Sequence, residues 1–514
     1  MLRSTVVMGM VLGVPGFLAL SQTADWTVAG QGLSNLRYQP AEKTITAQNV
    51  ARLGVKWVFT TGADVSATPT VSDGVVYAPD AAGNLYAVDA STGKAVWSRK
   101  ISSYEAVPNV YSRVSPAVYQ DELIIGDNIL KTQAHSGAHV MAIGRSNGAL
   151  LWNTQVDAHP AAIITGSPVV ANGVVYVGVS SLEEGLAEQT GYACCTFRGS
   201  VVALSASTGE KLWQTYMTPD NGGKTGAYSG AAIWGNPAVY PAKNLLYVAT
   251  GNNYTVPARA EQCEAYNLSH KTNKPCVAAN DYFDAVVALD MTTGEVRWAH
   301  RSSIYDASNL ACHLTPPGPN CPSPDGEDYD FGGGGPNLLG NTVGAGQKSG
   351  YYYTFDALTG KPVWATPVGP GGPLGGVLWG TSSDGARIYV AIANSKHVAW
   401  KLSPSGPSVT WGFWTALDRT TGKILWQTPD PTSGTLAISS MSVANGLLYV
   451  GSFDKVGHMY AINAATGQVL WKYSSGGSVL DAPSIVSGML FWGSGYNRFG
   501  IGTGNNKLYA FELQ

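Results

Sequence analysis

The sequence predicts an all-β protein, an eight-bladed β-propeller, from a recurring strand-and-turn pattern, a Trp at one fixed place per copy, and two chain ends that complete each other. In each copy an aliphatic strand runs into a turn ending in Gly, and Trp follows four residues later. Repetition at intervals of 40 to 85 residues is typical of repeat architectures. The seven copies are YAVDASTGKAVW (86–97), VMAIGRSNGALLW (140–152), VVALSASTGEKLW (201–213), VVALDMTTGEVRW (286–298), YYTFDALTGKPVW (352–364), WTALDRTTGKILW (414–426) and MYAINAATGQVLW (459–471).

The parts of each copy predict the parts of one blade. The alternating apolar run predicts a half-buried strand, and the Thr-Gly or Asn-Gly pair predicts a hairpin turn whose Gly accepts a positive φ. The returning strand carries the Trp, a large ring suited to a contact between neighbouring blades. By itself this repeat indicates a propeller and no chemistry.

The chain ends supply an eighth unit. Trp57, in LGVKWVFTTG, has no strand and turn of its own before it, whereas NKLYAFEL at 506–513 is a strand with no Trp after it. Joined, they make one more copy. We therefore expect the C-terminal strand to pair with an N-terminal strand, which closes the ring and removes exposed sheet edges.

Composition bounds the domain count and the partners. One continuous repeat predicts a single propeller domain over residues 22–514. Charged residues make up only 13 % of the chain and the net charge is −3, so no basic patch indicates nucleic acid or an anionic membrane as a partner. A small or neutral ligand fits this composition better.

The first residues are typical of an export signal. MLRSTVVMGMVLGVPGFLALSQTADW has one Arg, an apolar stretch broken by Gly and Pro, and small residues before a cleavage point after Ser21 or Ala24. This pattern predicts a signal peptide over 1–21 rather than a membrane-spanning helix. The mature protein is therefore expected in the periplasm or secreted, where disulfides are permitted.

Four of the six cysteines fall into two local pairs inside long insertions. Cys263 and Cys276 are 13 residues apart, and Cys312 and Cys321 are 9 apart. We expect each pair to form a disulfide that staples its insertion. Neither pair has the C-x-x-C-H spacing of covalent haem attachment.

The remaining two cysteines, Cys194 and Cys195, are adjacent in the sequence. A disulfide between neighbours forms a strained ring with a rigid flat edge that can lie against a planar ligand. The alternative is a pair of buried free thiols.

At this point the chain resembles the quinoprotein alcohol dehydrogenases, propellers that hold pyrroloquinoline quinone and a divalent metal on the central axis. It looks most similar to the polyvinyl alcohol dehydrogenase-like branch. The resemblance spans essentially 25–513 and is carried by DWTVAGQGLSNLRYQP, ACCTFRGSVVAL, ATGNNY, NCPSPDGEDYDFG, GAGQKSGYYYTFD and GGVLWG.

The resemblance implies a calcium site with two protein ligands. The family uses a Glu in a G-S-S-x-x-E stretch and an Asn in a T-G-N stretch, which here correspond to Glu183, with Glu184 beside it, and to Asn252. Carboxylate, amide and quinone oxygens together suit calcium. Without the resemblance, the two glutamates would be interpreted as a solvated loop.

The resemblance also implies the quinone's contacts. Thr165 and Ser180 match hydroxyls that bond its acid groups, and Arg113 matches a guanidinium that pairs with a carboxylate. Trp234 matches the indole on which the cofactor stacks. Lys348, in GQKSG, matches a catalytic cation that stabilises negative charge on the quinone oxygens.

In the relatives a vicinal disulfide lies against the quinone, so Cys194 and Cys195 are expected at the cofactor. Their position departs from the family pattern, because the methanol-oxidising relatives carry these cysteines before the position of Thr165, and here they follow Glu183.

The catalytic base departs from the pattern as well. The family's base is the last Asp of a D-x-W-D stretch, and the aligned residue here is Asn309, which cannot accept a proton. Asp306, one turn earlier, is the expected base, with Asp328 and Asp330 as alternates.

The implied function is an exported quinoprotein dehydrogenase in which a carboxylate takes the hydroxyl proton of an alcohol while hydride passes to the quinone. Polyvinyl alcohol or another secondary alcohol is the expected substrate. Lacking its own haem, the enzyme would pass electrons to a separate cytochrome c. The alternatives are a non-catalytic propeller that binds other proteins and a dehydrogenase that has lost its base.

Overall fold

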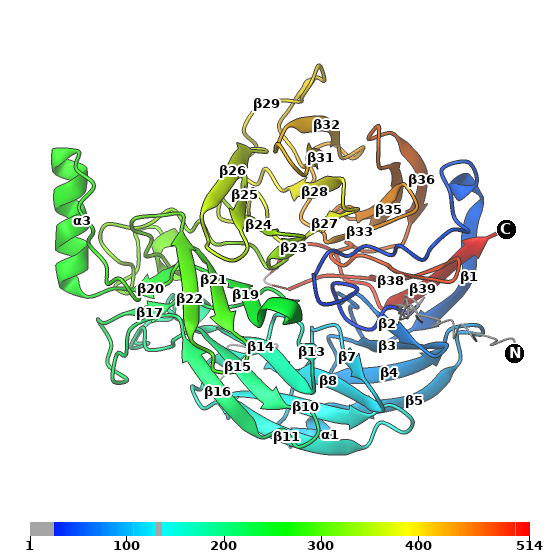
Figure 1. The fold of residues 1–514 in the computed structure, drawn as a ribbon, viewed down its shortest axis with the longest axis horizontal. Helices are drawn as coiled ribbons and strands as arrows, with labels where there is room; N and C mark the ends of the chain where they lie inside the picture. Colours follow the sequence, from blue (N-terminus) through cyan, green and yellow to red (C-terminus); the bar gives the residue numbers. More distant parts are fainter. Residues whose placement is uncertain (1–24, 106, 130–135, 499) are drawn as a thin grey trace, which may run out of the picture.

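The computed structural model describes residues 25–105, 107–129, 136–498 and 500–514. Eight antiparallel sheets, seven of four strands and one of five, are arranged around a central axis (Figure 1), which confirms the predicted eight-bladed propeller. The predicted signal peptide, residues 1–21, lies outside the described residues. Within them, none of the helices has the length and apolar character that crossing a membrane requires.

The blades follow one another along the chain, each running from an inner to an outer strand. Blades 1 to 4 consist of β2 (Thr70–Ser72), β3 (Val75–Pro79), β4 (Asn84–Asp89) and β5 (Ala95–Lys100); β7 (Ala117–Tyr119), β8 (Glu122–Gly126), β10 (Ala138–Gly144) and β11 (Leu150–Asp157); β13 (Val169–Ala171), β14 (Val174–Ser181), β15 (Ser200–Ser205) and β16 (Lys211–Tyr216); and β18 (Ala238–Tyr240), β19 (Leu245–Ala249), β21 (Ala285–Asp290) and β22 (Val296–Arg301).

Blades 5 to 8 continue this order, except that the last blade takes its outer strand from the N-terminal part of the chain. They consist of β23 (Asn337–Leu339), β24 (Thr342–Gly346), β25 (Tyr351–Asp356) and β26 (Pro362–Pro367); β27 (Thr381–Ser383), β28 (Arg387–Ile392), β31 (Phe413–Asp418) and β32 (Ile424–Pro429); β33 (Met441–Ala444), β34 (Leu447–Gly451), β35 (His458–Asn463) and β36 (Val469–Ser474); and β37 (Ser484–Val486), β38 (Met489–Ser494), β39 (Lys507–Leu513) and β1 (Leu53–Thr60).

The ring closes as predicted. Strand β1 pairs antiparallel with β39, from Leu53 opposite Leu513 to Thr60 opposite Lys507. Trp57 on β1 donates its indole N–H to the carbonyl of Ala90 in blade 1, so the joint between the last and first blades uses the same Trp contact as other joints.

Helices and short strand pairs lie in the connections. The helices are α1 (Ser102–Glu105), α2 (Glu183–Leu186), α3 (Ala258–His270), η1 (Val50–Arg52), η2 (Pro241–Lys243) and η3 (Leu310–His313). The short strands are β6 (Val110–Tyr111) with β9 (Asn128–Ile129), β12 (Ala162–Ile163) with β14, β17 (Ser229–Gly230) with β20 (Asn253–Thr255), and β29 (Trp400–Lys401) with β30 (Ser408–Val409). Figure 1 shows α3 projecting from the outside of the ring.

The repeated Trp and Gly form the contacts between blades. The turn Gly of one blade packs against the Trp of the preceding blade, as Gly422 does against Trp364. A Cβ on Gly422 would lie 2.5 Å from that indole, and the residue has φ +69°. Each turn therefore requires Gly both for its backbone conformation and for the closeness of the ring.

The three predicted disulfides are present. Cys263–Cys276 ties the middle of α3 to the loop that follows the helix, and Cys312–Cys321 closes the loop after η3. The third joins the neighbours Cys194 and Cys195.

The N-terminal segment before η1 follows the inner strands around the axis. Its backbone carbonyls accept hydrogen bonds from successive blades, including Thr27 from Val118 in blade 2 and Leu36 from Ser383 in blade 6. Arg37 of this segment lines a small axial cavity of about 50 Å³. This small cavity adjoins the larger axial cavity described next, because the two share the lining residues Arg113, Thr165 and Trp379.

Candidate cofactor and active site

A cavity of about 200 Å³ lies on the propeller axis, where connections that adjoin the inner strands converge. The residues expected from the sequence that line it are Arg113, Thr165, Ser180, Trp234, Asn252 and Lys348, together with Asp330, an alternate for the base. Further polar and aromatic lining residues are Ser181, Glu184, Tyr254, Trp379, Tyr496 and Arg498. The sequence therefore brings residues from distant blades to one cavity.

Two tryptophans build an aromatic wall in the middle of this cavity. Trp234 and Trp379 meet edge to face with their ring centroids 5.0 Å apart. Gly333 supports both, since a Cβ there would come within 2.5 Å of Trp379 and 2.6 Å of Trp234. Glycine at this position lets both rings lie against the backbone, with the half-buried Trp234 at the cavity surface.

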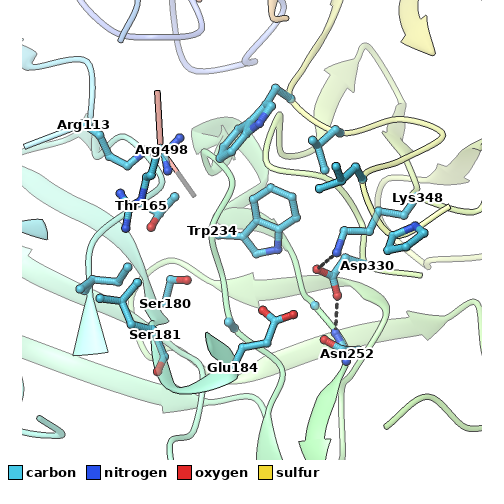
Figure 2. Close-up of a pocket in the computed structure, with 18 of the residues that line it drawn as sticks. Arg113, Thr165, Ser180, Ser181, Glu184, Trp234, Asn252, Asp330, Lys348 and Arg498 are labelled. Atoms are coloured by element: carbon cyan, nitrogen blue, oxygen red, sulfur yellow. Dashed lines mark hydrogen bonds and ion pairs between the residues drawn. The ribbon is translucent and has the colours of Figure 1, made fainter. Parts of the chain in front are cut away.

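An acidic cluster around one lysine forms one end of the cavity (Figure 2). The Lys348 ammonium lies 2.7 Å from a carboxylate oxygen of Asp328 and 2.9 Å from one of Asp330. Although burial opposes it, attraction by Asp328, Asp330 and Glu184 raises the pKa of Lys348 well above its usual value. Lys348 is therefore a fixed positive charge at the cavity wall.

Asn252 lies at the same end of the cavity as Lys348 and Asp330. Its backbone N–H donates to Asp330 over 2.6 Å, and its side-chain amide donates to the carbonyls of Asn253 and Ser308. Because the amide hydrogens are committed to these backbone acceptors, the side-chain oxygen is the atom that Asn252 offers to a ligand.

The adjacent glutamates of α2 face different surroundings. The Glu183 carboxylate accepts hydrogen bonds from the backbone N–H groups of Thr196 and Phe197 and from the Tyr192 hydroxyl. It is fully buried and does not line the cavity, whereas Glu184 does. The structure therefore brings Glu184 rather than Glu183 to the cavity, because α2 begins here and successive helical side chains point about 100° apart.

Burial raises the pKa of Glu184 to about 7, with Asp330 and Asp306 adding to the rise and Lys348 opposing it. Glu183 behaves oppositely. Burial raises its pKa, but His159 and the amide donors outweigh this effect and leave it lowered. The two neighbours therefore differ in electrostatics as well as in direction: Glu183 is an ionised clamp inside the protein, and Glu184 is a carboxyl at the cavity.

Cys194 and Cys195 are buried and do not line the cavity. They pack in the core of blades 2 and 3 and lead directly into Thr196 and Phe197, whose amides hold Glu183. The structure therefore separates the vicinal disulfide from the cavity and connects it to the glutamate clamp. Contact of these cysteines with a flat ligand remains a prediction, and the structure does not bring them to the cavity wall.

The opposite end of the cavity is rich in cations and hydroxyls. Figure 2 shows Arg113, Arg498 and Thr165 gathered there, with Ser180 nearby and Trp234 between them and the acidic cluster. The Arg113 guanidinium lies 4.7 Å from the Trp379 ring centroid. Arg498 was not among the residues expected from the sequence, because its segment carries no recognised motif.

Asp306 lies behind the cavity wall rather than on it. Its carboxylate accepts the backbone N–H of Asp328 over 3.2 Å and of Tyr329 over 2.8 Å. Burial raises its pKa to about 6. Asp306 thus holds the turn that presents Asp330. It is 2 % exposed and is not among the residues that line the cavity, so the structure does not bring the expected base to the cavity wall.

Asn309, aligned with the family's base, has a structural place. Its amide donates to the carbonyls of Tyr254 and Asn320, and its side-chain oxygen accepts the N–H of Ala311 at the start of η3. These bonds account for an amide at this position, because a carboxylate has no hydrogens to donate to two carbonyls.

The arrangement suits a flat, acidic ligand that helps to bind a cation. Guanidinium and hydroxyl groups at one end can bind carboxylates, an indole offers a stacking surface, and Glu184 with the Asn252 oxygen supplies the oxygen donors that calcium prefers. A propeller with these features on its axis belongs to the class of proteins that bind a planar cofactor there.

Comparison with known proteins identifies the family. A model described as glucose/ethanol/alcohol dehydrogenase, beta-propeller domain, matches residues 26–311. The chain is 30 % identical to a polyvinylalcohol dehydrogenase of a Pseudomonas species, over 93 % of this chain and 74 % of that protein. It is 29 % identical to the polyvinylalcohol dehydrogenase of a Sphingopyxis species, over 96 % and 77 %. The chain therefore belongs to the pyrroloquinoline quinone-dependent alcohol dehydrogenase family.

The crystal structure of the quinohemoprotein alcohol dehydrogenase from Comamonas testosteroni shares the fold, with a TM-score of 0.68 and 19 % identity over 96 % of this chain and 81 % of that one. A second family model, described as outer membrane protein assembly factor BamB, matches residues 414–513. That segment covers the last blades and excludes Glu184, Asn252, Asp330 and Lys348.

Proposed function

We propose that the protein is an exported dehydrogenase that oxidises an alcohol with pyrroloquinoline quinone and calcium. The observation that carries this proposal is the convergence, in one axial cavity, of the Trp234 indole, the Lys348–Asp330 pair and the oxygen donors of Glu184 and Asn252. The repeat alone does not require any of these groups.

In this proposal Glu184 and Asn252 hold the metal, and Glu183 has a supporting role. Arg113 and Arg498 bind acid groups of the cofactor, with Thr165 and Ser180 as hydrogen-bonding partners. Trp234 packs against its plane. This division assigns recognition of the cofactor to one end of the cavity and the reaction to the other.

Asp330 is the proposed base. It lines the cavity, as Asp306 does not, and its carboxylate is held by the Asn252 N–H and the Lys348 ammonium. Placed beside a bound alcohol, a carboxylate here accepts the hydroxyl proton as the C–H bond breaks. The quinone, when bound, supplies the two-electron acceptor for the hydride.

Lys348 completes the reactive end. Its charge is fixed by the neighbouring carboxylates, against the effect of burial, so it can stabilise negative charge that develops near Asp330 without itself having to gain a proton. Asp306 acts indirectly, by holding the backbone of Asp328 and Tyr329.

The substrate proposal follows from the apolar part of the wall. Ile163, Leu182, Leu374, Ile438 and Ile501 line the same cavity, which suits an alcohol with aliphatic substituents. Similarity to polyvinylalcohol dehydrogenases makes that polymer, or a smaller secondary alcohol, the first substrate to try. We further propose that a separate cytochrome c accepts the electrons, since the chain has no C-x-x-C-H sequence.

The test is dye reduction by the purified protein loaded with pyrroloquinoline quinone and calcium. We expect quinone-dependent reduction with primary or secondary alcohols and none without the quinone. A protein that binds the quinone yet oxidises no alcohol would indicate a lost base. A protein that binds no quinone would favour a protein-binding propeller, which the match of residues 414–513 to an assembly factor also suggests.

A further inference from the structure

A second group of metal-binding side chains lies in blade 2, outside the axial cavity. Glu105 ends α1, Asp127 connects β8 to β9, and His139 is on β10. The Nδ1 atom of His139 is 3.2 Å from Asp127 Oδ2 and 3.6 Å from Glu105 Oε2, and the three ligand atoms all lie within 4.8 Å of one another. Three separate segments thus meet at one point.

Within the described parts of the chain no N–H group donates to either oxygen of the Glu105 carboxyl, although its side chain is only 2 % exposed. Its neighbours are the Asp127 carboxylate and the His139 imidazole. Both oxygens are buried, and Oε2 faces His139. A buried acid in this position needs a compensating cation or a proton.

The two side chains that face Glu105, those of Asp127 and His139, are held in place by contacts with each other. Asp127 Oδ1 accepts the backbone N–H of His139 over 2.7 Å, while Oδ2 faces the imidazole. These contacts hold the carboxylate and the imidazole in a defined relation before any ion arrives, which reduces the entropy lost on binding.

We propose that Glu105, Asp127 and His139 bind a divalent cation of the zinc or manganese type. Zinc accepts His nitrogen and carboxylate oxygen at about 2.0–2.2 Å, which separates two ligands of a tetrahedral ion by about 3.4 Å. The observed separations of 3.2 and 3.6 Å agree with that spacing. The imidazole distinguishes this site from the oxygen-only donor set at the axis, which suits calcium.

The ion would tie blade 2 to the cavity wall. Asn128, next to Asp127, accepts a hydrogen bond from Arg498, and the Asp127 carbonyl accepts the N–H of Ile164 beside Thr165. Arg498 and Thr165 both line the axial cavity. An ion that fixes Asp127 therefore supports the end of the cavity that we assign to cofactor recognition, without contacting it.

The test uses full-length protein already loaded with pyrroloquinoline quinone and calcium, titrated with zinc chloride and analysed for bound metal after gel filtration. We expect one zinc per chain beyond the calcium, and loss of that zinc in Glu105→Gln. Glu188→Gln, which changes an exposed glutamate, is the matched control and should keep it. Glu184→Gln should lose calcium and keep zinc, so failure of the axial proposal is distinguishable from failure of this one.

Anomalous diffraction at the zinc edge, from crystals of the parent protein, does not depend on any variant folding. A peak between the three side chains is expected. Absence of that peak in zinc-soaked crystals, or zinc binding by Glu105→Gln equal to that of the parent, would overturn the proposal and leave a proton as the occupant of the Glu105 site.

Discussion

The rim and the axis of the propeller are built from the same eight blades, but the side chains make different kinds of contact in the two regions. At the rim, one contact recurs: the turn Gly of a blade packs on the Trp of the blade before it, as Gly209 on Trp152 and Gly422 on Trp364. On the axis the blades do not repeat one another. One supplies Glu184, another Asn252, and another Lys348.

One set of residues therefore holds the blades together, and a separate set forms the candidate active site. The rim contact is neutral, with an indole N–H donating to a backbone carbonyl, as from Trp97 to Arg145 and from Trp471 to Leu53. The axial contacts are charged and buried. Changes at the rim should therefore alter stability, and changes on the axis should alter function.

The largest effect is expected from Asp330→Asn. If this carboxylate takes the alcohol proton, turnover should fall by on the order of 10²-fold or more while quinone affinity stays close to that of the parent, because general base catalysis typically contributes that much. Dye reduction and quinone titration measure the two properties.

Asp306→Asn is the comparison variant, and we expect a smaller loss because Asp306 only holds the turn before Asp330. A full loss in Asp306→Asn together with an active Asp330→Asn would return the role of base to Asp306. Creation of activity by Asn309→Asp in an otherwise inactive protein would instead mark a lost base.

A change at the rim should have an intermediate effect, on stability. Gly422→Ala adds a Cβ 2.5 Å from Trp364 at φ +69°, whereas Gly434→Ala has φ +79° and no atom within 4 Å. Both pay for a left-handed backbone, about 1–2 kcal/mol. Only the first crowds a blade contact, which should cost roughly 1–3 kcal/mol more in the free energy of unfolding.

Urea denaturation of the two variants and the parent measures this difference. Equal destabilisation by the two substitutions would mean that the Trp–Gly contact tolerates a methyl group, and that the turn conformation alone explains the repeated glycine.

The smallest effect on function is expected at Asp430, a buried carboxyl far from the axial lining. Burial raises its pKa to about 7. A raised pKa means that the folded protein keeps this proton while the unfolded chain releases it, so the contribution to stability is full below about pH 4 and declines as pH rises toward 7. Asp430→Asn removes that decline, at most about 1.4 kcal/mol per pH unit.

The free energies of unfolding of Asp430→Asn and the parent, measured between pH 4 and pH 8, show whether the stability of the parent declines with pH relative to that of the variant. We expect the turnover of the two proteins to be the same. A difference between the two that does not vary with pH would show that Asp430 is ionised throughout and that burial alone does not identify its protonation state.

The rim could be predicted from the sequence because its contacts repeat. The fixed spacing between the turn Gly and Trp predicts the ring of blades, and the incomplete repeats around Trp57 and 506–513 predict how the ring closes. The short spacing within each cysteine pair predicts the two loop disulfides. Repetition gives several independent samples of one contact. Each residue of the axial cavity, by contrast, occurs in one blade and has no repeated counterpart in the others.

The axial residues were therefore found only through the resemblance to a known family, position by position. Trp234 and Lys348 line the cavity as expected. The choice between Glu183 and Glu184 depends on where α2 begins, which neighbouring glutamates do not reveal. Asp330 lines the cavity and Asp306 does not, and this depends on how a long insertion folds back on itself, a path that no local sequence pattern predicts.

The central claim is that Glu184, rather than Glu183, holds calcium beside the quinone. The direct measurement is the affinity of the protein for pyrroloquinoline quinone, with calcium and with a chelator, in the parent, Glu184→Gln and Glu183→Gln. We expect calcium to strengthen binding in the parent, to have no effect in Glu184→Gln, and to retain a reduced effect in Glu183→Gln, whose clamp on Thr196 and Phe197 is weakened. Equal quinone affinity with and without calcium in the parent, or a calcium effect that survives in Glu184→Gln and vanishes in Glu183→Gln, would contradict the account.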